Sequence, residues 1–286
     1  MNAPIPRSIL ITGCSSGIGR CVAEGLQARG YRVFATARKP EDVEALTTAG
    51  FEALQLDLDD SASIQQAVEN VLGQTGGRLY ALFNNGAYGQ PGAVEDLSRE
   101  ALRAQFETNF FGWAELTRLL IPQMREHNEG RIIQNSSVLG FVAMPFRGAY
   151  NASKFAIEGL SDTLRLELRG SNIHVCLIEP GPIESRFRQN ALLALQQHID
   201  IENSIHRDKY HGVLERLQKE GPAVPFTLPP EAVLKRVIHA LESPRPKARY
   251  AVTFPTYLFA FLKRLLPTRT LDSLLVKAGS DGKKSR

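Results

Sequence analysis

Short runs of β-branched and other apolar residues alternate with longer segments of helical periodicity from residue 8 to about residue 180. In the longer segments, apolar residues recur at a spacing near 3.6 and the segments end at glycines, which is typical of helices. Strands that alternate with helices pair as parallel neighbours and are buried on both faces, which explains their nearly continuous apolar character. The sequence therefore predicts an α/β fold, a doubly wound parallel sheet of about seven strands with helices on both faces. The predicted strands are 8–13, 31–37, 52–58, 81–85, 131–137, 174–181 and 248–254.

The alternation of strands and helices breaks after Gly181. Residues 182–229 are mixed in character and richer in charge, and a long insertion of this kind is typical of a lid over a binding site. A helix predicted over 230–243 and the last strand complete the unit. The sequence thus predicts a single domain over residues 7–254, with a substrate lid at about 182–229.

Residues 255–286 form a predicted C-terminal amphipathic extension and tail. The apolar part of 256–279 is too short to cross a bilayer. Its Leu, Phe, Lys and Arg content suits a helix at a membrane interface or in a partner's groove, and equally a helix packed on its own domain ahead of a solvated tail. We expect the packed helix and keep contact with a membrane surface as the alternative.

Composition places the chain among ordinary water-soluble proteins, with 43% hydrophobic and 22% charged residues. Its 34 basic residues are scattered among 30 acidic ones, so the net charge of +4 does not predict a nucleic-acid partner. The N-terminal residues hold only a short apolar run, unlike a signal peptide, and we expect a cytoplasmic location. The three cysteines form no CxxC pair, so neither structural disulfides nor a metal site is expected.

Three glycines occupy the turn between the first predicted strand and the first predicted helix. Glycine there permits a tight turn, close approach of the backbone to a pyrophosphate, and close packing of the helix on the strand. The spacing GxxxGxG differs from the common GxGxxG fingerprint, but the context of strand, turn and helix is the same. Two serines in the turn can donate hydroxyl groups toward phosphate or ribose. The cofactor contacts predicted in this turn are Gly13, Ser15, Ser16, Gly17, Ile18 and Gly19.

The end of the second strand predicts which dinucleotide binds. A carboxylate at this place would accept hydrogen bonds from the adenosine ribose of NAD, but the chain has Arg38 and Lys39 instead. A guanidinium can stack on adenine and pair with a 2′-phosphate, so we expect NADP(H) as the cofactor in preference to a merely solvated strand end. Asp57 and Leu58, which end the third strand, are predicted to lie beside the adenine.

Tyr150 and Lys154 lie four residues apart and therefore share one face of the helix predicted over 149–170. On its own, this pattern leaves two interpretations open. The pair can be a core tyrosine beside a lysine that extends to water. It can also be a phenol whose proton affinity is tuned by the neighbouring ammonium group.

Seven motifs in order make the chain resemble the short-chain dehydrogenase/reductase family over roughly residues 7–254. They are TGCSSGIG (12–19), LDLDD (56–60), NNGA (84–87), NFFG (109–112), NSS (135–137), YNASK (150–154) and PGPIES (180–185). The resemblance is closest to the branch that includes 17β-hydroxysteroid dehydrogenases, retinol dehydrogenases and bacterial NADP-dependent aldehyde reductases. It implies a Rossmann-like sheet, and a homodimer or homotetramer built on the helices that carry Asn109 and Tyr150.

The resemblance implies four catalytic positions, Asn109, Ser137, Tyr150 and Lys154. Tyr150 would protonate the carbonyl oxygen during reduction and accept the proton during oxidation. Lys154 would stabilise the phenolate and hold the nicotinamide ribose, and Ser137 would fix the substrate oxygen. Asn109 would hold a water that continues a proton relay from Lys154. On this interpretation, Tyr150 and Lys154 share a face because the ammonium group of Lys154 tunes the proton affinity of the Tyr150 phenol.

Further cofactor contacts are implied by the motifs at the ends of the fourth and sixth strands. Two departures from the family pattern occur there. The usual Asn-Asn-Ala-Gly is Asn-Asn-Gly-Ala at 84–87, and the usual threonine after Pro-Gly is Ser185, which keeps the hydroxyl group. The implied contacts are Asn85, Gly86, Ala87, Pro180, Gly181, Ile183 and Ser185.

Apolar side chains predominate in 138–148, which we expect to form the wall opposite the lid. The sequence therefore predicts NADP-dependent, reversible reduction of a lipophilic aldehyde or ketone to an alcohol. One alternative is an NAD-preferring dehydrogenase of hydroxysteroids or retinol-like alcohols. Another is a protein that senses NADP without turnover, although a sensor needs no proton relay. The predicted wall residues are Leu139, Phe141, Val142, Met144 and Phe146.

Overall fold

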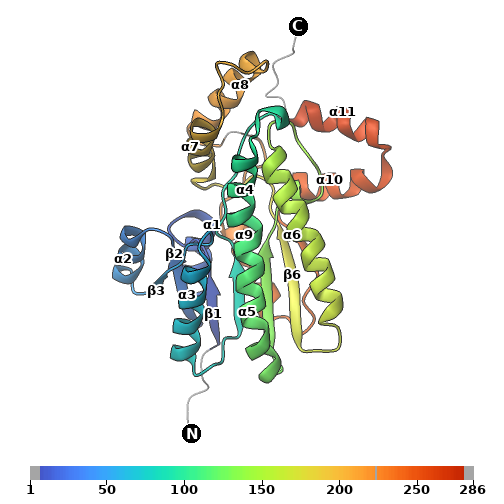
Figure 1. The fold of residues 1–286 in the computed structure, drawn as a ribbon. Helices are drawn as coiled ribbons and strands as arrows, with labels where there is room; N and C mark the ends of the chain where they lie inside the picture. The colour runs from blue at the N-terminus through green and yellow to red at the C-terminus, as the bar shows by residue number, and fades with distance from the viewer. Residues whose placement is uncertain (1–6, 223, 280–286) are drawn as a thin grey trace.

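The computed structural model describes residues 7–222 and 224–279. In this part of the chain, seven parallel strands form one sheet in the order β3-β2-β1-β4-β5-β6-β7 (Figure 1). This arrangement confirms the predicted fold class and each predicted strand. The strands are β1 (Ser8–Ile11), β2 (Arg32–Ala37), β3 (Glu52–Gln55), β4 (Ala81–Asn84), β5 (Gly130–Asn135), β6 (Ile173–Glu179) and β7 (Arg249–Ala251).

Helices cover both faces of the sheet, and each layer has its own core. Successive side chains of a strand point to opposite faces, so Ile9 and Ile11 lie in one core and Leu10 in the other. The first core includes side chains of α1 (Gly17–Gln27), α2 (Pro40–Thr48) and α9 (Glu231–Glu242). The second includes side chains of α3 (Ser61–Thr75), α5 (Gly112–Glu126) and α6 (Gly148–Glu167).

The order of the strands fixes where a ligand can bind. From β1 the chain builds β2 and β3 on one side and then returns to place β4 on the other side of β1. The loops after β1 and β4 therefore leave in opposite directions and open a crevice at the carboxyl edge of the sheet, the usual ligand site of such folds. The glycine turn and the NNGA segment, at 12–19 and 84–87, lie at this edge.

The apolar spacing of residues 99–127 predicts one long helix, but the structure interrupts it. It consists of α4 (Arg99–Phe106), a π-helical turn, η2 (Glu107–Phe111), and α5. A π turn accommodates one extra residue in a helix and is frequent at functional sites. Here it places Asn109 inward, where its side-chain amide donates to Tyr88 O at 2.9 Å and its carbonyl accepts from Tyr88 N at 3.2 Å.

Two other segments are more helical than expected. The predicted lid holds α7 (Phe187–His198) and α8 (Arg207–Gln218), which enclose a small apolar core of their own. The C-terminal extension forms two helices, α10 (Phe254–Leu265) and α11 (Thr268–Gly279), separated at Pro267, which has no amide hydrogen to continue a helix. Among the residues described, no helix is both long and apolar enough to cross a bilayer.

Candidate active site

The glycine turn brings the ends of β1 and β4 into backbone contact. Gly13 has a φ of 70°, and a Cβ there would lie 2.6 Å from Gly86 Cα. A Cβ on Gly19 would lie 2.1 Å from Gly13 O, so only glycine fits at that position. A Cβ on Gly86 would lie 3.3 Å from Gly13 N, which is tight. Glycine at 86, where the family usually has alanine, therefore eases the same close approach.

Thr12 and Asn85 hold this turn in place. The Thr12 hydroxyl accepts hydrogen bonds from the amides of Asn85 and Gly86, at 2.8 and 2.7 Å. The Asn85 side-chain amide donates to Thr12 O at 3.0 Å, and its carbonyl accepts from Asn135 at 2.9 Å. The structure therefore gives Asn85 a positioning role, and its predicted contact with a cofactor stays a prediction.

Helix α1 begins directly after the glycine turn, and its N-cap Ser16 makes no side-chain hydrogen bond to the first helical amides. Those amides carry the positive end of the helix dipole and are the usual site for a pyrophosphate. This uncapped helix N-terminus lies beside a turn in which Gly13 and Gly19 leave no room for side chains, and that combination fits a dinucleotide. The turn residues predicted from the sequence, 13 and 15–19, lie together here.

Tyr150 lies in the first turn of α6 and Ser137 directly after β5. A hydrogen bond with Ser137 lowers the pKa of Tyr150, but burial is the larger effect and raises it to about 12. The Ser137 hydroxyl also accepts from Leu139 N at 3.1 Å, which caps the short helix η3 (Val138–Gly140) and fixes the position of that hydroxyl. The phenol is therefore protonated near neutral pH and able to donate a proton.

Lys154 is 1% exposed, and its ammonium group has specific partners. Its Nζ donates to Asn135 O at 2.8 Å and lies 4.2 Å from the centre of the Trp113 ring and 5.6 Å from the centre of the Tyr150 ring. Burial lowers the pKa of Lys154 to about 7, while the charge of Glu158 opposes the shift. The structure thus places the ammonium group beside the phenol, on the buried face that the two residues share.

Asn109 is fully buried in the π turn. Beyond its two hydrogen bonds with Tyr88, its side-chain amide lies 3.3 Å from Ser153 Oγ on α6. It therefore fastens the loop after β4 to the helix that carries Tyr150 and Lys154. The proton relay through water that the resemblance implies stays a prediction.

The residues expected to contact the adenosine lie at the ends of β2 and β3. Arg38 and Lys39 are exposed, and Gln55 of β3 fixes the backbone by donating to Arg38 O at 3.0 Å. Leu58 is 8% exposed and lies against α5, since a Cβ on Gly112 would be 2.2 Å from Leu58 O. Asp57 accepts from Asp59 N at 3.1 Å and so shapes the loop. Their contacts with a cofactor stay predictions.

The loop 180–185 crosses above the glycine turn. Pro180 O accepts from Val138 N at 2.8 Å, and a Cβ on Gly17 would lie 2.9 Å from the Ser185 Cβ. A Cβ on Gly181 would lie 2.1 Å from Thr253 Oγ1, so this glycine permits the close packing of the loop. The glycine turn and the loop 180–185, which are far apart in the sequence, therefore meet. A site for the nicotinamide half of a dinucleotide requires such a meeting.

Phe187 and Trp113 belong to the site, although the sequence reasoning assigned them no role. The Phe187 ring, from the start of α7, meets the Tyr150 ring edge to face with centroids 5.3 Å apart. Trp113 Nε1 donates to Gly86 O at 2.8 Å while its ring faces Lys154. The sequence held one signal for a role of Phe187 in the site, because Phe187 lies two residues after Ser185, at the start of the predicted lid.

Comparison with known proteins agrees with this geometry. Residues 7–195 match the family model described as short chain dehydrogenase. The chain is 45% identical over 269 residues to the uncharacterized oxidoreductase YbbO of Escherichia coli K12, covering 94% of each chain. It is 33% identical over 281 residues to the NADPH-dependent 3-dehydrocapnine reductase of Ornithobacterium rhinotracheale, covering 95% of this chain and 96% of the relative. A crystal structure of a short-chain dehydrogenase from Streptomyces avermitilis superposes with a TM-score of 0.77 and 31% identity, covering 92% of this chain and 94% of the other.

Proposed function

The chain belongs to the short-chain dehydrogenase family of oxidoreductases, and from that premise we propose that it reduces lipophilic aldehydes or ketones with NADPH. The observation that carries the proposal is the meeting of Ser137, Tyr150 and Lys154 beside the glycine turn, with Phe187 above the phenol. NADPH, when bound at the turn, would supply the hydride. The protein's own side chains supply the proton and the orientation.

Tyr150 is the general acid in the proposed reaction. Its phenol donates a proton to the carbonyl oxygen as the carbonyl carbon accepts the hydride, and the product is an alcohol. The Ser137 hydroxyl holds the same oxygen and aligns it with the phenol. Lys154 stabilises the phenolate that remains until the proton is replaced, because an ammonium group nearby favours the charged form. In the oxidative direction the same groups act in reverse.

The preference for NADPH is proposed from the charges at the end of β2. Arg38 and Lys39 are exposed there, and the nearest carboxylate along the chain, Glu41, lies 3.6 Å from Lys39 Nζ. A cationic edge suits a 2′-phosphate and leaves the ribose hydroxyls of NAD without an acidic partner. The relative from Ornithobacterium, which is named as NADPH-dependent, supports the same choice.

The proposed substrate is lipophilic because the side chains expected to surround it are apolar. Leu139 and Val142 belong to the apolar core beneath α10 and α11. Phe141, Met144 and Tyr150 are partly buried against that core. Phe146 packs against Tyr210 of the lid, with ring centroids 5.3 Å apart. The Phe187 ring contacts the Tyr150 ring, and the expected wall divides between the core beneath α10 and α11 and the core of the predicted lid.

The test of the proposed function compares NADPH and NADH oxidation with aliphatic aldehydes, retinal-like aldehydes and steroid ketones. We expect turnover with NADPH, and we expect Arg38→Asp to lower kcat/KM for NADPH by about 10- to 100-fold while NADH is affected little, since a charge-assisted contact with the phosphate is lost. Arg125→Asp, at an exposed position on α5, is the control. A wild-type enzyme that prefers NADH would contradict the cofactor assignment.

Phe187 is expected to set the preference for lipophilic substrates. A Cβ on Gly89 would lie 2.6 Å from Phe187 Cζ, so the ring seals the space between the lid and the loop after β4. We expect Phe187→Ala to raise KM for long-chain carbonyls by about tenfold, because an apolar contact is lost, with a smaller effect on kcat. Leu193→Ala, on the exposed side of the same helix, should leave both constants unchanged. An equal loss in both variants would show that the lid is merely destabilised.

A further inference from the structure

Helix α10 carries an exposed apolar stripe along one face. The exposed fractions are 56% for Phe254, 53% for Tyr257, 60% for Phe261 and 62% for Leu265. The residues follow the helical spacing of three and four, so they lie on the same face. Phe226 of the lid segment extends this face, with its ring centroid 5.1 Å from that of Phe254. An apolar surface of this length on a soluble fold marks a contact site.

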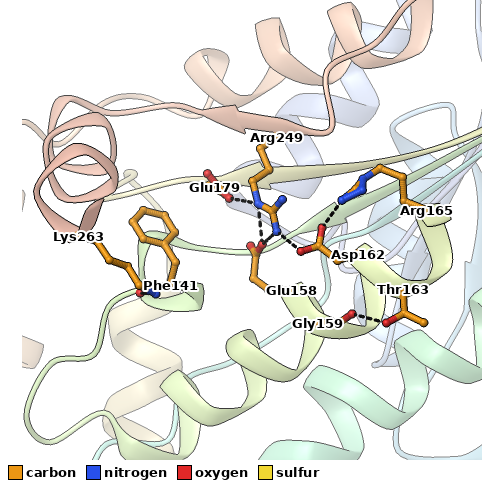
Figure 2. A network of polar contacts seen from close by, with 9 residues as sticks. All are labelled: Phe141, Glu158, Gly159, Asp162, Thr163, Arg165, Glu179, Arg249 and Lys263. Atoms are coloured by element: carbon orange, nitrogen blue, oxygen red, sulfur yellow. Dashed lines mark hydrogen bonds and ion pairs between the residues drawn. The ribbon is translucent and has the colours of Figure 1, made fainter. Parts of the chain in front are cut away.

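Cations border the stripe. Lys263 and Arg264 lie in the last turn of α10, and the helix itself holds no acidic residue. A cavity of about 600 Å³ runs along its flank and is lined by further basic side chains. The carboxylates in its wall, Glu158 and Glu179, pair with Arg249 and are only 10% and 6% exposed, so they lie beneath the exposed cations of the outer rim (Figure 2). The basic residues that line this cavity are Arg236, Lys247, Arg249, Lys263 and Arg264.

The combination of aromatic stripe and cationic border fits one class of partner. Aromatic and aliphatic side chains enter the boundary between headgroups and acyl chains, while lysine and arginine on the flanks meet anionic headgroups. We propose that α10 is a docking surface for an anionic lipid bilayer, on which the protein rests without spanning it. This inference goes beyond the proposed function and does not depend on turnover.

The opposite face of α10 connects this surface to the active site. Phe259 of α10 lies in one apolar cluster with Leu271 and Leu275 of α11. The same cluster holds Val138, Leu139 and Val142, in the segment that backs the substrate wall. Lys263 Nζ donates to Phe141 O at 2.6 Å, which ties the end of α10 to that wall (Figure 2). Figure 1 shows α10 and α11 standing out from the side of the body, where a flat surface can reach them. Docking would place the substrate wall close to lipophilic compounds that are dissolved in the bilayer.

The test is co-sedimentation of the full chain with phosphatidylcholine vesicles that contain or lack phosphatidylglycerol. We expect binding to the anionic vesicles, weakened by salt, and much weaker binding to neutral ones. The double variant Phe261→Ser/Leu265→Ser should bind about tenfold or more weakly, because buried apolar area is lost. Arg264→Glu should lose the preference for anionic vesicles. The controls are Leu166→Ser, a residue 67% exposed on α6, and Arg125→Glu, which should bind as the wild type does.

Three results would overturn the proposal. One is a folded wild-type chain that stays in the supernatant with both kinds of vesicle. The second is equal loss of binding in the control variants. The third is light scattering that shows a wild-type dimer and a Phe261→Ser/Leu265→Ser monomer, since the stripe would then be covered by a second copy of the chain. Reductase activity enters none of these readouts, so failure of the docking proposal and failure of the proposed function are distinguishable.

Discussion

Replacement of Tyr150 by phenylalanine is expected to lower kcat/KM for carbonyl reduction by about 10²- to 10⁴-fold, the usual contribution of a positioned general acid. The change removes only the hydroxyl, and the ring contact with Phe187 is retained. Because burial holds the pKa of Tyr150 at about 12, the wild-type phenol carries its proton throughout the neutral range. The loss should therefore lie in the proton transfer and appear mainly in kcat.

Steady-state kinetics and NADPH fluorescence titration together test this prediction. Cofactor affinity should change by no more than a few fold, since the glycine turn and Lys154 are untouched. Tyr31→Phe, outside the crevice, is the matched control and should keep wild-type rates. If Tyr150→Phe retained most of the activity, another group would have to be the acid, and the assignment of Ser137 as its partner would also be wrong.

The sheet could be predicted because its signals are local. Strands such as β1 and β4 are buried along their whole length, and their sequences, SILI and ALFN, are mostly apolar. The glycine turn is recognisable for a similar reason, since Gly13 and Gly19 are required by contacts within a few residues of the strand end and by one neighbouring loop. All four implied catalytic side chains, Asn109, Ser137, Tyr150 and Lys154, likewise come from short motifs, and their catalytic roles stay predictions.

The features that the sequence reasoning missed depend on contacts between distant segments. The π turn at Asn109 is held by hydrogen bonds to the backbone of Tyr88, which the helical pattern around Asn109 does not show. Phe187, at the start of the predicted lid, reaches Tyr150 only because the chain after β6 folds back toward α6. The break at Pro267 was readable, but the apolar pattern continues on both sides of it and predicted one helix. Tertiary contacts decided the first two of these features, and the proline itself decided the third.

Replacement of Arg249 is expected to have the second large effect, a loss of stability of the fold. Its guanidinium lies between three carboxylates: Glu179 at 3.1 Å, Glu158 at 3.0 Å and Asp162 at 2.7 Å (Figure 2). The side chains of Glu158 and Glu179 are only 10% and 6% exposed. Burial and the charge of Glu158 together raise the pKa of Glu179 to about 7, against the opposing effect of Arg249. The cation thus permits the carboxylates of α6, the helix that carries Lys154, to lie close to Glu179 at the end of β6.

We expect Arg249→Gln to lower the free energy of unfolding by about 2–4 kcal/mol, somewhat less than for a fully buried ion pair because the Arg249 side chain is 40% exposed. Denaturant unfolding followed by circular dichroism measures the change. In the wild type, a Glu179 pKa raised from 4.5 to about 7 means that the folded state binds the proton more tightly, so this residue's contribution to stability falls as pH rises across that window. Loss of Arg249 raises that pKa further.

The deficit of Arg249→Gln should therefore be larger at about pH 8 than at about pH 5, where protonation removes the repulsion between Glu158 and Glu179. Glu179→Gln in the Arg249→Gln background should recover much of the loss at the higher pH, because one of the unpaired charges is gone. Arg29→Gln, which removes the exposed pair with Glu242, is the control and should lower stability far less, because an exposed pair contributes little. If the two arginine variants lost equal stability with no dependence on pH, the three carboxylates would be solvated, and Arg249 would be an ordinary surface cation.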